Sequence, residues 1–452
     1  MATLSRTWDQ LTLPGKTLAI LIPLLALLTT GLVITILLFG QQILDILVFN
    51  LPIVRFVFAA TVLLLLAPPI AFVIIYMEMK VIALMNLRIG PDRVGPFGSL
   101  LSTVHGLKVL MKEDFTPTRA DPVVFTWAPV VVFSTMALSA IVIPFAPGLF
   151  AQDFNLGLLY FFAIGGMTVV GLLMGGWASF NKYSLLGGLR SAAQIVSYEI
   201  PLTLSVVGLV MLAGTMSLNQ IVLQQSTSGW FTDWYAFRQP LGFLIFAIAA
   251  TAEANRTPFD LTEADSEIVA GFATEYSGMR FGFFFFAEYI GVFVISALTT
   301  VLFLGGWNAP FPVPEISWVV NPGSLGIGLL FVIALVPLIG TLLFALPFYL
   351  FRSQTRWWVA LIIGFVLFNV VVGGLLGLWA YINFDWVAGL LWFLMKTFGL
   401  VFLFVWMRGT LPRVRIDQLM GFAWKWLLPA SLLNLFVTAA AILVIDGLKG
   451  GA

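Results

Sequence analysis

Long apolar runs separated by short polar connections occupy nearly the whole of this 452-residue chain. A helix needs about 20 apolar residues to cross the hydrocarbon core of a bilayer. Eleven runs reach or approach that length and predict membrane-spanning helices at 17–39, 52–77, 123–147, 155–179, 194–214, 239–254, 282–305, 325–351, 357–382, 386–407 and 427–446. Pro68-Pro69 predicts a kink in the second of them. The Gly-Gly pairs at 165–166, 175–176 and 373–374 allow helices to approach closely.

Composition places the chain among polytopic all-α membrane proteins. Hydrophobic residues make up 60% of it and charged residues only 10%, whereas a soluble domain carries about 25% charged residues. The chain has no cysteine, which excludes thiolate-bound iron–sulfur clusters, thiolate zinc sites and disulfides. His105 is the only histidine, so haem is not expected. We therefore expect no metal and no redox cofactor here, and the net charge of +1 indicates no nucleic-acid partner.

Lysine and arginine are distributed unevenly between the two sides of the predicted bundle. With a cytoplasmic amino terminus, 18 of the 22 fall inside and 3 outside, and Lys396 lies within a span. Cytoplasmic loops carry such an excess. One of them, 78–121, contains glycine–proline turns at 90–91 and 95–96 and then an amphipathic stretch at 99–112. This stretch predicts a helix on the membrane surface, although an ordinary basic loop or a lipid contact would show the same pattern.

The segment from Glu253 to Tyr289 is unusually rich in acids. It holds a third of the 21 acidic residues: Glu253, Asp260, Glu263, Asp265, Glu267, Glu275 and Glu288. Acids in a first helical turn complement the helix dipole, which would account for Glu263 and Asp265 alone. Glu253 and Glu288 lie next to or inside apolar runs, where ionisable groups are costly and usually serve proton or ion pathways. Because closely spaced carboxylates titrate together, the segment predicts proton transfer.

Two further charged residues lie inside predicted spans. Glu199 stands two residues before Pro201, and a proline kink frees backbone carbonyls that can admit water. Glu199 is therefore suited to a proton path, unless its carboxylate lies in the membrane interface. Lys396 is near the centre of the run 386–407. Because an unpaired ammonium there would be expensive, we expect it to face a carboxylate or a water-filled path, the alternative being that it snorkels to the interface.

Several long motifs of the chain resemble those of a known protein family. They are LRIGPDRVGPFG, KEDFTP, LLGGLRSAAQIVSYEI, AEANRTPFDLTEADSEIVAGFATEY, AEYI and RGTLPRVRIDQLMGFAWKWLLP. In this order, and with an interruption at 308–385, the chain resembles the H subunit of the bacterial respiratory NADH:quinone oxidoreductase, complex I, whose mitochondrial counterpart is subunit 1. The resemblance implies a plasma-membrane subunit without prosthetic groups. It would form much of the quinone tunnel and begin an acidic chain that links quinone reduction to proton pumping.

The resemblance also assigns roles to individual residues. It implies a quinone tunnel and cytoplasmic collar built from Glu78, Arg88, His105, Lys108, Arg256 and the turn at Gly90–Gly95. It implies a proton relay through Glu199, Glu253, Asp260, Glu263, Asp265, Glu267, Glu275 and Glu288, to which the charge pattern adds Lys396. The partners implied are the other membrane and peripheral-arm subunits, which would hold NADH, FMN and iron–sulfur clusters, together with membrane quinone and lipid.

The chain departs from this family at a few positions. Asp265 stands where a glutamate is usual, Met79 where an arginine is usual, and His105 where an aspartate is usual. Loss of one positive and one acidic group is consistent with a paired change near the tunnel mouth. Three spans are additional: one at 17–39 and an inserted pair within 325–382.

The chain is therefore interpreted as a single membrane domain, 1–452. Its core tunnel and relay region is 52–305, and its carboxy-terminal core helices are 386–446. Two other interpretations remain open. The chain could be the equivalent subunit of a relative fed by ferredoxin, F420 or hydrogen, or a stand-alone secondary transporter. Its long cytoplasmic loops favour soluble partners over alternating access, and no inverted repeat is visible.

Overall fold

A computed structural model of the chain describes residues 52–226, 229–260, 270–311 and 385–450. Nearly all of them fall in one compact unit formed by Arg55–Val313 and Gly389–Ala452. Its α-helices are α3 (Pro52–Met85), α4 (Leu101–Leu110), α5 (Pro122–Ala140), α6 (Gly157–Ala178), α7 (Lys182–Ala213), α8 (Leu218–Gln224), α9 (Tyr235–Arg238), α10 (Pro240–Glu253), α12 (Gly278–Phe303), α15 (Asp385–Thr410), α16 (Ile416–Phe422) and α17 (Leu428–Gly450). Short 3-10 turns lie at Pro96–Gly98, Phe231–Asp233 and Gly271–Ala273, and a π-helical segment, Ala423–Leu427, joins α16 to α17.

These elements confirm the predicted all-α membrane class. Throughout the described ranges no strand is present, and seven helices are long and apolar enough to cross a membrane. They lie in α3, α5, α6, α7, α12, α15 and the α16–α17 pair, and each coincides with a predicted span. The predicted span at 239–254 is the shorter apolar helix α10. The predicted spans at 17–39, 325–351 and 357–382 lie outside the described residues.

Local sequence explains where several helices begin and end. Asp121 caps α5, its carboxylate accepting from the backbone N–H groups of Val123 and Val124. Asn181 caps α7 in the same way through the N–H of Tyr183. Such side-chain oxygens satisfy amides that have no partner in the first helical turn. Gly214 ends α7 with φ +65°, a left-handed conformation that glycine adopts without steric cost.

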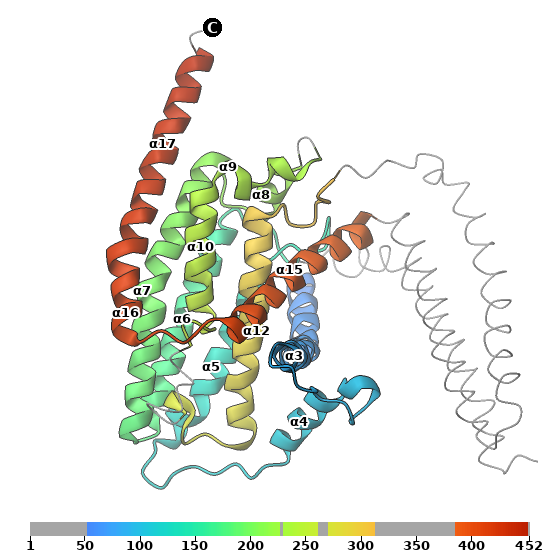
Figure 1. Ribbon diagram of the computed structural model, residues 1–452, viewed down its shortest axis with the longest axis vertical. Helices are drawn as coiled ribbons and strands as arrows, with labels where there is room; N and C mark the ends of the chain where they lie inside the picture. Colours follow the sequence, from blue (N-terminus) through green and yellow to red (C-terminus); the bar gives the residue numbers. More distant parts are fainter. Residues whose placement is uncertain (1–51, 227–228, 261–269, 312–384, 451–452) are drawn as a thin grey trace, which may run out of the picture. The chain divides into compact units, whose positions relative to one another are not determined.

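The core is built around α12, which is the most deeply buried of the long helices. It packs beside α5, which packs on α6. In turn α6 lies against α7, and α7 also contacts α10 and α17 (Figure 1). Helices α3 and α15 join the same hydrophobic core through residues such as Ile74 and Phe393. Gly176 confirms the predicted close approach of helices, because a Cβ there would meet Gly188 Cα of α7 at 3.2 Å.

The amphipathic stretch forms α4, which contacts α12. Its small residues face inward: Ser102 is buried, and a Cβ on Gly106 would meet the ring of Phe72 at 2.6 Å. The apolar side chains Val104 and Leu107 are exposed instead. The hydrophobic side of this helix is therefore not part of the described core and remains open to lipid or to another protein.

Candidate functional site

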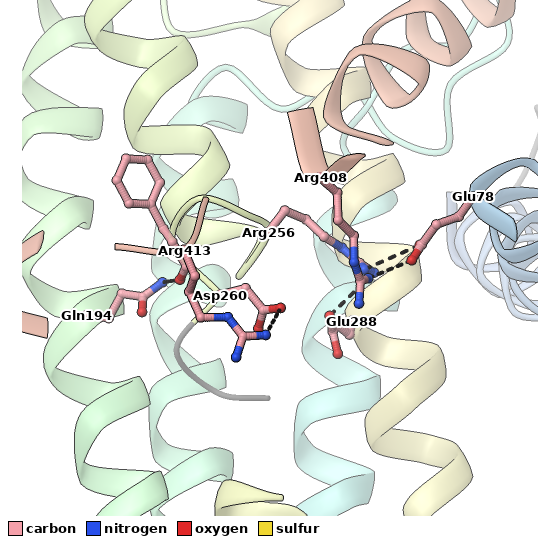
Figure 2. A network of polar contacts seen from close by, with 8 residues as sticks. Glu78, Gln194, Arg256, Asp260, Glu288, Arg408 and Arg413 are labelled. Carbon is pink, nitrogen blue, oxygen red and sulfur yellow. Dashed lines mark hydrogen bonds and ion pairs between the residues drawn. The ribbon is translucent and has the colours of Figure 1, made fainter. Parts of the chain in front are cut away.

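Arg256 is the centre of a buried polar network (Figure 2). It lies in the turn that follows α10 and is only 4% exposed. Its guanidinium is 3.5 Å from Glu78 of α3 and 3.4 Å from Glu288 of α12, and it lies over the ring of Tyr289 at 4.3 Å. Burial opposes its charge, but Glu288, Tyr289 and Glu78 raise the pKa of Arg256 above its ordinary value, so it remains a cation.

A second arginine completes this network. Arg408, near the end of α15, is 2.6 Å from Glu78. Glu78 thus contacts two guanidinium groups, one from the turn after α10 and one from α15. The distance to Arg408 is that of a direct charge-assisted hydrogen bond, whereas the two Arg256 distances are longer. The network ties four separate parts of the fold together at one buried point.

The same turn carries a further ion pair. Asp260 is buried and lies 3.3 Å from Arg413, in the connection between α15 and α16. The backbone N–H of Val414 donates to the carbonyl of Pro258 at 3.0 Å. The turn after α10 is therefore held by the connection after α15 as well as by its own helix.

Three neighbouring cavities lie along α12, and Glu288 of the network lines two of them. We call the first, of about 290 Å³, the lysine cavity, because Ser102, His105, Lys108 and Lys112 line it beside aromatic residues of α3 and α12. The second, the arginine cavity, is about 330 Å³ and is lined by Glu288, Arg408 and Arg413 among apolar side chains. The third, the glutamate cavity, is about 60 Å³ and contains Glu253 and Glu288.

The cavities share walls in a regular order. Phe281 and Phe285 line both the lysine and the arginine cavities. Met136, Asn255 and Glu288 line both the arginine and the glutamate cavities. The three spaces therefore lie in a series, the first at the amphipathic helix, the second at Arg408 and Arg413, and the third at Glu253.

The acids of the predicted relay are found in different settings. Glu253 Oε2 is buried and has no hydrogen-bond partner within the described ranges. Glu199 of α7 lies against Gly166 of α6, where a Cβ would meet its Oε1 at 3.4 Å, so the missing side chain leaves room for the carboxylate. Glu275 accepts a hydrogen bond of 2.6 Å from Asn181. The remaining acids, Glu263, Asp265 and Glu267, lie outside the described residues.

The residues of the predicted tunnel are only partly brought together. Glu78 and Arg256 form the buried network, while His105 and Lys108 line the lysine cavity. Arg88 is exposed in the loop after α3. The site also contains Arg408 and Arg413, which the sequence predicted only as charges on the cytoplasmic side. In the sequence both arginines follow the apolar run 386–407 closely, and this position is the signal that could have identified them as site residues.

Lys396 has different partners from those expected. Its ammonium donates to the backbone carbonyls of Leu304, Gly306 and Asn308 at 2.5–3.0 Å, and lies 4.2 Å from the centre of the Trp234 ring. Carbonyl oxygens thus occupy the place where a carboxylate was expected, because the loop after α12 folds back over this part of α15. The assignment of Lys396 to the relay stays a prediction.

Comparison with known proteins gives consistent matches. The chain matches the family model described as NADH dehydrogenase over residues 56–439. The H subunit of NADH-quinone oxidoreductase from Bacillus cytotoxicus is 42% identical over 387 residues, which cover 85% of this chain and 93% of the relative. The same subunit from Brevibacillus brevis is 40% identical over 393 residues, covering 86% and 95%. These matches confirm the resemblance that the motifs indicate.

Proposed function

This chain belongs to the family of H subunits of NADH-quinone oxidoreductase, and we propose that it forms the quinone-binding tunnel of that complex and the first part of its proton relay. The observation that carries the proposal is the series of three cavities leading from the basic amphipathic helix to Glu253. Apolar walls with a few convergent polar groups are typical of small-molecule sites.

The chemistry of a quinone fits this series. A membrane quinone has a long apolar tail and a polar ring, so it needs an opening to the lipid and a lined path inward. The lysine cavity lies on the inward side of α4, opposite the exposed Val104 and Leu107, and four phenylalanines of α3 and α12 line it. The arginine cavity offers hydrogen-bond donors from Arg408 and Arg413, which stabilise negative charge on a reduced quinone ring. Electrons would come from iron–sulfur clusters on partner subunits, which would also hold FMN and the NADH site.

The relay follows from the far end of the same series. Reducing a quinone to a quinol consumes protons as well as electrons, and it changes the charge next to Glu288. Because Glu288 lines both the arginine and the glutamate cavities, such a change acts directly on the carboxylates. We assign the described part of the relay to Glu288, Glu253, Glu199 and Glu275, with Asp260 in the adjoining ion pair. The same proposal covers Glu263, Asp265 and Glu267, and it keeps Glu78 in the tunnel, where it contacts Arg256.

The assembly partners are proposed from an exposed surface. The loop and helix between residues 84 and 115 present large apolar side chains to the outside, with Leu87 95%, Ile89 89% and Met111 86% exposed. Exposed apolar patches of this kind mark interaction sites. We assign this surface to the peripheral-arm subunits and to lipid of the bacterial plasma membrane, with Arg88 and Lys112 contributing charge.

The tunnel is tested by labelling. An azido-quinone added to the assembled complex in its native membrane should crosslink, on illumination, to peptides from α4 and from the first half of α12. An excess of unmodified quinone should remove the label. Labelling of this chain only at other peptides, or labelling that quinone does not compete, would show that the lysine cavity is not the route.

The relay is tested by removing charge without changing shape. Glu288→Gln and Glu199→Gln should each lower coupled quinone reduction at least about tenfold, equivalent to roughly 1.4 kcal/mol in the barrier. Asp417→Asn is the matched control, because Asp417 is an exposed carboxylate paired with Arg415. Normal turnover and normal pumping in both glutamine variants would contradict the relay.

A further inference from the structure

Gln194 of α7 has an unusual set of hydrogen-bond partners. Its side chain is completely buried, and its Nε2 donates toward three oxygens: Ala252 O at 2.9 Å, Phe259 O at 2.8 Å and Asn255 Oδ1 at 3.2 Å. Only the NH₂ end of an amide can face three acceptors, so the orientation of this amide is fixed. Its Oε1 consequently points away and has no hydrogen-bond partner within the part of the chain that the structure describes.

The three oxygens lie on both sides of Arg256. Ala252 is in the last turn of α10, whereas Asn255 and Phe259 belong to the turn that follows this helix, Phe259 next to Asp260. Gln194 therefore contacts the chain both before and after Arg256. Asn255 has φ +49°, so the middle of the turn also adopts a conformation that needs support from its surroundings.

The other supports of the turn lie within it or at one end: the N–H of Arg256 donates to Thr251 O at 3.2 Å, and its carbonyl accepts from the N–H of Phe259 at 2.9 Å. The bond from Val414 to Pro258 holds only the second half of the turn, and the ring of Phe259 packs 5.5 Å from that of Tyr198. The ion pairs of Arg256, at 3.4 and 3.5 Å, are too long to fix its position by themselves. Gln194 donates to carbonyls both before and after Arg256 and thereby joins this part of the chain to a separate helix, α7.

We infer that Gln194 is a positioning residue for Arg256, holding the turn so that the guanidinium lies between Glu78 and Glu288. This inference rests on the proposed function and adds a residue to it. Because α7 also carries Glu199, five residues beyond Gln194, the same helix holds one acid of the relay and sets the cation beside another. Gln194 acts through the turn and does not itself transfer a proton.

The inference is tested with two substitutions of similar size. Gln194→Met removes the amide, so turnover per assembled complex should fall about tenfold at every pH, corresponding to a loosely held Arg256. Gln194→Glu places a carboxylate against three oxygens. Its charged form is repelled by them, whereas its protonated form can still donate one hydrogen bond. Activity of this variant should therefore fall as the pH rises and recover partly as the pH falls, a dependence absent from the unsubstituted enzyme.

The control makes the same chemical change elsewhere. Gln220→Glu lies in α8 on the surface, where the side chain accepts only from Thr215, and it should leave the pH profile unchanged. A second readout is a double-mutant cycle with Arg256→Lys. If Gln194 acts through Arg256, Gln194→Met should cost much less in the Arg256→Lys background than alone.

The outcomes separate this inference from the proposed function. Loss of assembled complex with normal turnover per complex, an unchanged pH profile for Gln194→Glu, or additive effects in the cycle would each overturn the positioning role. Full activity in Arg256→Lys and Glu288→Gln would instead remove the proposed relay, whatever the Gln194 variants do.

Discussion

One buried and one partly buried cation of this molecule each have an aromatic ring beneath them but differ in the kind of partner they contact. Arg256 lies 4.3 Å from the ring of Tyr289, and Lys396 lies 4.2 Å from the ring of Trp234. Arg256 contacts two carboxylates, whereas Lys396 donates to three backbone carbonyls. Glu288 and the loop that holds Lys396 are separated by roughly 20 Å along α12.

The difference between the partners has a chemical consequence. A carboxylate can take up or release a proton, and each change alters the charge that Arg256 experiences. A backbone carbonyl cannot, so the surroundings of Lys396 keep the same charge whatever happens nearby. Charges at membrane depth are usually assigned to proton or ion pathways. We therefore expect the partners of a cation, and not its depth alone, to decide whether it is suited to that role.

The largest effect is expected at Arg256. Arg256→Met leaves Glu78 and Glu288 without this cation, and breaking a buried ion pair from one side costs about 3–5 kcal/mol. Quinone reduction per assembled complex should fall by at least about a hundredfold. Arg256→Lys keeps the charge without the planar fork, so it should assemble better and retain part of the activity. Full activity in the methionine variant would mean that the arginine is not part of the reaction.

A smaller effect of a different kind is expected at Lys396. Lys396→Met leaves buried carbonyls without their donor, which costs about 1–3 kcal/mol. The thermal midpoint of the assembled complex should fall, while turnover per complex should change less than about twofold. Lys396→Arg, which keeps donors on a longer side chain, should recover part of the stability. A tenfold loss of turnover at normal stability would instead support the relay assignment and break the comparison.

These two sites also mark what could be predicted from sequence. Seven of the predicted spans coincide with long apolar helices in the described residues, because a run of about 20 apolar residues is a local property. Glu288 was predicted because it stands in the acid-rich segment and inside an apolar run, whereas Arg256 came from the resemblance. Glu78 came from the resemblance, and its contact with Arg256 joins residues far apart in the chain.

The partners could not be found in the same way. Arg408 and Arg413 lie at the end of α15 and just after it, more than a hundred residues from the turn beside them, and nothing in the local pattern indicates that pairing. Lys396 was expected to face a carboxylate or a water-filled path, because an unpaired ammonium within a span is costly. The loop carbonyls that it binds exist at every position and carry no sequence signal. Gln194 was not predicted as a site residue for the same reason, because two of its three acceptors are backbone carbonyls.

The aromatic rings offer a matched pair of tests. A cation over a buried ring gains about 0.5–2 kcal/mol. Tyr289→Leu should lower turnover several-fold at nearly normal stability, because the ring helps to place Arg256 between its carboxylates. Trp234→Leu should lower the thermal midpoint at nearly normal turnover. Measuring both quantities on both variants checks the comparison, and equal effects of the two variants on turnover would contradict it.

The smallest effect is expected at a third cation, Arg238, which separates the influence of burial from that of partner type. Arg238 has a carboxylate partner, Asp233, at 3.1 Å, and it lies 6.0 Å from the ring of Tyr235. Unlike Arg256 it is 44% exposed, so water screens the pair. Surface ion pairs contribute about 0–1 kcal/mol.

Asp233→Asn should therefore leave turnover unchanged, and it should lower the thermal midpoint by no more than the loss of about 0–1 kcal/mol would produce. Asp233 precedes Trp234, the residue beneath Lys396, so the variant also tests whether a neighbouring change reaches the Lys396 site. Turnover and thermal midpoint are measured as for the other variants. If Asp233→Asn lowers turnover as strongly as Glu288→Gln, a carboxylate partner alone is sufficient and burial is not required. If turnover is unchanged, the role of Arg256 depends on both its carboxylates and its exclusion from water, because only a poorly screened charge transmits a protonation change to its neighbours.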